Sequence, residues 1–133
     1  MKKSVLDSFA VLAFLFKERG YEKVLALLET ASEQDEVVFL TAANWAEVRY
    51  IVERKKGINE WQNVRTSLLG LPIQIRPVDQ ALAELAGEIK AAKKMSLADC
   101  FAAALAKDLK ADLYTGDPEF RQVEKEIQIV WLG

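Results

Sequence analysis

The fold of this chain can be worked out from the stretch LYTGDPEF, residues 113–120. Residues 111–114 predict a β-strand, and Gly116 is expected to let the chain turn after it. Pro118 suits the first position of a helical turn over residues 118–123, because its fixed φ and missing N–H cost nothing there. Asp117 is then placed to cap that turn. An acid therefore stands where a strand ends and a helical segment begins.

The same order of strand, acid and helix occurs at the start of the chain. Residues 4–6 read as a short strand, Asp7 and Ser8 follow it, and residues 9–17 read as a helix. Further strands are predicted at 37–40, 72–75 and 127–131, and further helices at 21–31, 42–55, 58–69, 79–93 and 96–107. This alternation predicts an α/β fold, with a central, mostly parallel sheet of about four or five strands flanked by helices on both faces.

The length and composition fit one soluble domain over residues 1–133. The formal net charge of −2 does not by itself favour nucleic-acid binding, although local basic clusters can still support it. No apolar run approaches the ~20 residues of a membrane span. The opening MKKSVLDSFAVLAFLF is interrupted by Asp7 and lacks a cleavage site of small residues, so we expect a cytoplasmic protein without a membrane partner.

Two absences restrict the chemistry. The chain has no histidine, and Cys100 is its only cysteine. A histidine general base, a Ser-His-Asp triad, a zinc site with histidine ligands, a thiolate metal cluster and an internal disulfide are all excluded. Acid–base or metal chemistry would have to use carboxylates, whose hard oxygen atoms suit Mg²⁺ or Mn²⁺.

Four acids stand where an acid is unexpected or well placed: Asp7, Glu47, Asp99 and Asp117. Each also has an ordinary structural interpretation. Asp7 and Asp117 can be helix caps, and Asp99 can complete a capping box that Ser96 begins. Glu47 can be a solvated helical glutamate, although it lacks a basic residue four positions later.

Taken together, the four acids predict a single site. Two of them follow strands and two lie in early helical turns, and these positions meet at the carboxyl edge of a parallel sheet. Clustered carboxylates repel one another, and a divalent cation removes that conflict. One or two Mg²⁺ or Mn²⁺ ions could then activate water and neutralise phosphate charge, which makes phosphoryl chemistry the natural use of the site.

At these residues the sequence resembles the PIN-domain family, in particular the VapC-type toxins of bacterial and archaeal toxin–antitoxin pairs. The resemblance covers nearly the whole chain and follows its order. It rests on the segments SVLDSFAVLAFL, TAANWAEVRYIVERKKG, MSLADCFAAALA and TGDPEF. The four acids in this order are specific, whereas any one segment alone would be weak.

The resemblance implies a small α/β fold and a Mg²⁺- or Mn²⁺-dependent endoribonuclease. It also implies a homodimer and an antitoxin that binds over the active site. Asp7, Glu47, Asp99 and Asp117 match the family's catalytic and metal-binding quartet. Supporting polar roles beside the metal fall to Thr115, Asn44 and Ser8.

Other functions stay open. A non-catalytic PIN-like module that binds RNA or protein is the main alternative. A phosphatase of the dehalogenase type needs a second aspartate two residues after Asp7, where Phe9 stands. A phospho-receiver domain needs adjacent acids near the start of the chain, which are missing here.

Candidate RNA contacts are basic residues near the acids, although solvated helix ends explain most of these residues better. They are Arg49, Arg54, Lys55, Lys56, Lys93 and Lys94. Trp45 and Trp61 could stack on bases, but such residues more often belong to the core or to a dimer contact, and they are assigned no site role. The apolar run of Leu12, Phe14, Leu15 and Phe16 favours a dimer or antitoxin contact, or else a helix enclosed by its own domain.

Overall fold

The computed structural model describes residues 2–133, which form five strands, six α-helices and one 3-10 helix, η1. The strands are β1 (Ser4–Leu6), β2 (Val38–Thr41), β3 (Ile73–Arg76), β4 (Asp112–Thr115) and β5 (Gln128–Trp131). The helices are α1 (Ser8–Leu15), α2 (Tyr21–Glu33), α3 (Ala42–Lys56), α4 (Ile58–Leu69), α5 (Gln80–Ala92), α6 (Leu97–Leu109) and η1 (Pro118–Val123). Every predicted strand and helix is present, with ends that differ by at most two residues.

The strands form one sheet in the order β3-β2-β1-β4-β5, and all four neighbouring pairs are parallel. The predicted α/β fold with a central parallel sheet is therefore confirmed. From β1 the chain builds outward through β2 to β3, then crosses to the other side of β1 to add β4 and β5. This reversal puts the carboxyl ends of β1 and β4 side by side, the place where parallel sheets bind ligands.

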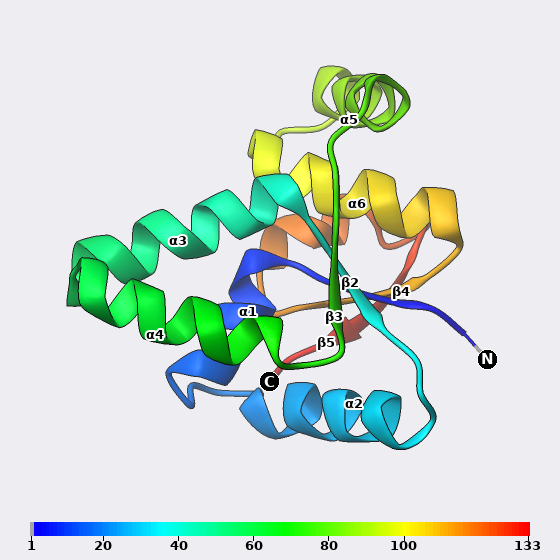
Figure 1. Cartoon of the computed structure of the whole chain (residues 1–133). Helices are drawn as coiled ribbons and strands as arrows, with labels where there is room; N and C mark the ends of the chain where they lie inside the picture. The colour runs from blue at the N-terminus through cyan, green and yellow to red at the C-terminus, as the bar shows by residue number, and fades with distance from the viewer. Residues whose placement is uncertain (1) are drawn as a thin grey trace.

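Helices cover both faces of the sheet because successive strand residues point to opposite sides. In β1, Val5 belongs to a core cluster shared with α5, α6 and η1, while Leu6 belongs to a second cluster shared with α1 to α4. Figure 1 shows α5 and α6 on one side of the sheet and α2 on the other. The central sheet is therefore buried from both directions.

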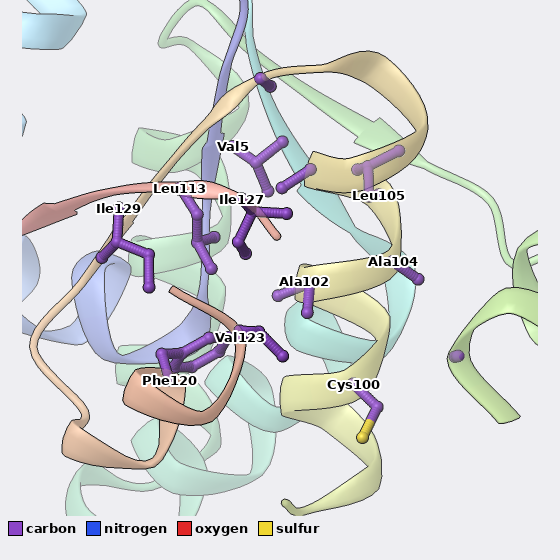
Figure 2. Packing of buried hydrophobic residues seen from close by; sticks show 14 of the residues in the cluster. Val5, Cys100, Ala102, Ala104, Leu105, Leu113, Phe120, Val123, Ile127 and Ile129 are labelled. Carbon is purple, nitrogen blue, oxygen red and sulfur yellow. The ribbon is translucent and has the colours of Figure 1, made fainter. Parts of the chain in front are cut away.

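Small residues on α6 let this helix pack closely against the sheet. Ala102, Ala103, Ala104 and Ala106 are all buried, at 0–1% exposure. Figure 2 shows Ala102 and Leu105 beside Val5 and the strands, with Phe120 of η1 closing the cluster. The close approach carries the start of α6, and with it Asp99, to the carboxyl edge of the sheet.

The apolar run near the start of the chain is mostly enclosed by its own domain. Leu12, Phe14, Leu15 and Phe16 are partly buried and pack against the second core cluster. The helix also stops earlier than predicted, at Leu15, and Lys17 has a left-handed φ of 51°. Among the helices of residues 2–133, none combines the length and apolar character that a membrane crossing needs.

The packing of α6 predicts that a larger side chain at Ala102 destabilises the protein. Ala102→Leu should lower the free energy of unfolding by about 1–3 kcal/mol, because overpacking a tight core forces side chains and backbone to shift. Ala83→Leu on the exposed side of α5 is the matched control and should change it by less than about 0.5 kcal/mol. Urea denaturation measures both, and equal stability of the two variants would contradict the close packing of α6.

Candidate functional site

Asp7 lies directly after β1 and is 1% exposed. Its Oδ1 accepts a hydrogen bond of 2.8 Å from the Ala10 backbone N–H, so Asp7 caps α1 as predicted. Its Oδ2 accepts a hydrogen bond from the Thr115 hydroxyl at the end of β4. Both oxygens are thus held, and the carboxylate joins the two strands at which the sheet reverses.

Asp117 continues this network on the other strand. Its backbone N–H donates to the Thr115 hydroxyl oxygen at 3.0 Å. Its Oδ1 accepts from the Glu119 N–H at 2.9 Å, which confirms the predicted cap of η1. Thr115 is fully buried, so its hydroxyl fixes Asp7 and Asp117 relative to each other.

Asp99 enters the site from the start of α6. The Ser96 hydroxyl accepts from the Asp99 N–H at 3.2 Å, as the predicted cap requires, and Asp99 is 9% exposed. The Ser96 N–H in turn donates to Glu119 Oε1 at 3.0 Å. Glu119 therefore ties η1 to the first turn of α6.

Three carboxylates meet at this point. Asp99, Asp117 and Glu119 each present an oxygen, and these three atoms lie within 4.8 Å of one another. Glu119 was missed by the sequence analysis, because an acid in the first turn of a helix is ordinary. The sequence feature that could have identified Glu119 is its position two residues after Asp117, in the segment predicted to lie at the carboxyl edge of the sheet.

Asn44 supports the site from α3 and is fully buried. Its Nδ2 donates to the Ser8 hydroxyl at 2.9 Å and to the Ala98 carbonyl at 3.4 Å. Its Oδ1 accepts from the Thr41 hydroxyl at 2.6 Å. The amide thus joins the starts of α1, α3 and α6, and Ser8 takes part in the same hydrogen-bond network.

Glu47 follows Asn44 by three residues and is half-buried. Its charge makes a small contribution to raising the pKa of Asp99, so the two carboxylates lie near each other. It is not part of the closest group of three. The structure therefore brings the predicted quartet into one region, with Asp99 and Asp117 nearest to each other.

Burial and the neighbouring acids together raise the pKa of two of these carboxyl groups. The pKa of Asp7 is raised to about 7, chiefly by burial and further by the charges of Asp99 and Asp117, against the lowering effect of its hydrogen bonds. The pKa of Asp99 is also raised to about 7, by burial first and then by Asp117, Glu119 and Glu47. The neighbouring acids therefore add to the effect of burial on the pKa of both Asp7 and Asp99.

No basic side chain of residues 2–133 forms an ion pair with these five acids, since the two described ion pairs join Lys2 to Asp112 and Arg49 to Glu53. The donors are all hard oxygen atoms held close together. That donor set fits Mg²⁺ or Mn²⁺, whose charge would also relieve the repulsion.

Gly116 matters for space rather than for the turn. Its φ is not in the left-handed region, in contrast to Gly20 and Gly57. A Cβ at residue 116 would lie 2.2 Å from Cε1 of Phe9. The missing side chain of Gly116 therefore lets the Phe9 ring pack directly against the main chain just before Asp117. This corrects the expectation that Gly116 is needed for the turn.

The comparisons with known proteins agree with this fold. The family model of the PIN domain matches residues 4–126. No curated protein matches the sequence. A DNA-bound VapBC structure from Salmonella typhimurium has a TM-score of 0.75 at 17% identity, over 98% of each chain.

Two further solved structures are similar over nearly their whole length. A toxin–antitoxin complex from Klebsiella pneumoniae has a TM-score of 0.69 at 20% identity, over 96% of each chain. VapC20 from Mycobacterium tuberculosis, a Sarcin-Ricin loop cleaving toxin, has a TM-score of 0.70 at 17% identity, over 91% of this chain and 95% of that one. At these identities the likeness establishes the fold.

The raised pKa of Asp7 predicts how stability depends on pH. The pKa of about 7 in the folded state exceeds the ordinary aspartate value of 3.8, so the folded state holds an extra proton between these pH values. The contribution of Asp7 is fully present below about pH 4 and is lost as pH rises through about 7. In the presence of EDTA, Asp7→Asn should stabilise the protein relative to the parent at pH 8, by about 1–4 kcal/mol, and much less at pH 4.

Urea denaturation at both pH values measures this difference. Asparagine keeps the capping acceptor for the Ala10 N–H, so the variant is expected to fold. Asp108→Asn, an exposed acid in the last turn of α6, serves as the control and should show no such pH-dependent gain. A parent and Asp7→Asn variant that differ equally at pH 4 and pH 8 would contradict the raised pKa.

Proposed function

Since the chain belongs to the PIN-domain family, we propose that it is a Mg²⁺- or Mn²⁺-dependent endoribonuclease and the toxin of a toxin–antitoxin pair. The observation that carries the proposal is the group of five carboxylates at the reversal of the sheet, with no basic side chain of the described chain paired to them. The substrate is RNA, and the reaction is hydrolysis of a phosphodiester bond.

Asp99, Asp117 and Glu119 are proposed as the residues that hold the metal ion, with Asp7 and Glu47 completing the acidic set. When bound, Mg²⁺ or Mn²⁺ would lower the pKa of a water molecule and neutralise charge on the phosphate. Glu119 is an addition to the quartet of Asp7, Glu47, Asp99 and Asp117. Glu119 is included because one of its carboxylate oxygens lies within 4.8 Å of oxygens of Asp99 and Asp117.

The other residues act by position. Thr115 donates to Asp7 and accepts from the Asp117 N–H, so it keeps these two carboxylates in register. Asn44 and Ser8 hold α1 and α3 against the start of α6. Glu47 lies at the side of the cluster, where it would ligate or orient the attacking water.

The proposed partners are an RNA substrate, a cognate antitoxin that covers the acidic site, and a second copy of the chain in a homodimer. The antitoxin is supported by the similar structures, two of which are toxin–antitoxin or VapBC assemblies. A cytoplasmic location goes with this function, because cellular RNA is the proposed substrate.

The proposed function predicts that Asp99→Asn abolishes Mn²⁺-dependent cleavage of RNA. The rate should fall by at least ~100-fold, because one ligand of a charge-stabilising site is lost. Asp108→Asn on the same helix removes the same charge at an exposed position and should keep the parental rate. Equal cleavage by Asp99→Asn and the parent, measured on a fluorescent RNA, would overturn the assignment.

A second prediction concerns Glu119. Glu119→Gln should weaken Mn²⁺ binding, measured by isothermal titration, by about 10- to 100-fold. Glu124→Gln, an exposed acid just after η1, is the matched control and should bind as the parent does. If neither the parent nor the quartet variants bound Mn²⁺ at all, the non-catalytic PIN-like module would be the better interpretation.

A further inference from the structure

A row of three side chains on α3 leads away from the acidic site. Glu47, Tyr50 and Arg54 are spaced by three and four residues, which places them on one side of a helix. The Tyr50 hydroxyl lies 3.5 Å from Glu47 Oε2. The guanidinium carbon of Arg54 lies 4.9 Å from the centre of the Tyr50 ring. The row is therefore continuous by contact, and it spans about 10 Å along the helix axis.

Tyr50 differs from the other aromatic residues of this region in its exposure. It is 45% exposed, whereas Trp61 is 2% exposed and lies in the core. Trp45 packs edge-on against Trp61, with ring centres 5.2 Å apart, and is half-buried. The two tryptophans thus stabilise the contact between α3 and α4, while the ring of Tyr50 stays accessible beside the site.

The charge of this region also differs from that of the whole chain. Residues 42–69, which contain α3 and α4, carry five basic and three acidic residues, in a chain with 18 basic and 20 acidic. Figure 1 shows the two helices side by side at one end of the molecule. Arg49 is paired with Glu53 at 3.1 Å, and the described ion pairs do not involve Arg54. Arg54 is therefore available for an anionic group.

We propose that α3 is the track on which single-stranded RNA lies beside the acidic site, with a base stacked on Tyr50 and a phosphate bound by Arg54. This inference rests on the proposed ribonuclease function and specifies its substrate class. An aromatic face binds any base by stacking, and a nearby cation binds the backbone. Bases inside a duplex are already stacked on their neighbours, so the ring selects unpaired nucleotides.

The test measures binding separately from cleavage. In an Asp99→Asn background, the affinity for an unstructured fluorescein-labelled 12-mer RNA is measured by fluorescence anisotropy. Tyr50→Leu should weaken binding by about 5- to 50-fold, because a leucine has no planar face for a base to stack on. Tyr50→Phe keeps that face and should bind within about twofold of the parent. The same RNA in duplex form should bind more weakly and respond little to Tyr50→Leu.

The salt dependence of RNA binding tests the role of Arg54 separately from that of Tyr50. Arg54→Ala should weaken binding and reduce the slope of log K against log salt by about 0.7, the value for one phosphate contact on a single strand. Tyr50→Leu should leave that slope unchanged. Lys107→Ala, an exposed residue near the other end of α6, removes the same charge and should change neither the affinity nor the slope.

The outcomes separate the two proposals. If the parent chain cleaves no RNA, the ribonuclease function fails, and the anisotropy results still decide whether RNA lies on α3. If Tyr50→Leu and Arg54→Ala bind the single strand as the Asp99→Asn background does, the track is wrong, and the exposed ring marks a protein contact instead. Both substitutions are at solvent-accessible positions, and circular dichroism checks that the variants fold.

Discussion

Repulsion between carboxylates of like charge is the constraint on which the arrangement of this molecule depends. Asp7 and Asp99 are nearly buried, and Asp117 is close enough to raise the pKa of each. Such a group lowers stability when all of its members are ionised, so the surrounding structure must hold them in place. The free energy for this comes from the two apolar clusters that sandwich the sheet.

Three features of the fold resist that repulsion at the site itself. The reversal between β1 and β4 puts two strand ends side by side, and the Thr115 hydroxyl bridges their acids. The alanine side of α6 lets the helix carrying Asp99 lie close to the sheet. The buried amide of Asn44 joins α1 and α3 to the start of α6. Each contact restrains a different acid-bearing element.

Much of this could be predicted from the sequence, because its signals are local. Apolar strands, amphipathic helices and caps such as Asp7, Ser96 and Asp117 all appear as predicted. The strand order depends on which helices pack on which face, and no local pattern contains that information. Glu119 was missed for a related reason, since only the approach of η1 to α6 turns an ordinary helical acid into a neighbour of Asp99.

The hydrogen bonds of Asp7 differ from those of Asp117 and Glu119, and this difference indicates different roles in the proposed site. Asp7 uses its two oxygens to accept from the Ala10 N–H and the Thr115 hydroxyl, both neutral donors, deep beneath the surface. Asp117 and Glu119 are only half-buried, and each is held by a backbone N–H while it contributes to the closest oxygen cluster. A buried carboxyl group whose two oxygens are both engaged is suited to fix the geometry of the strand ends, and the more accessible carboxylates are suited to contact an ion directly. Capping therefore does not compete with ligation in the proposed site, because the same hydrogen bonds that begin α1 and η1 orient the carboxylates toward one another.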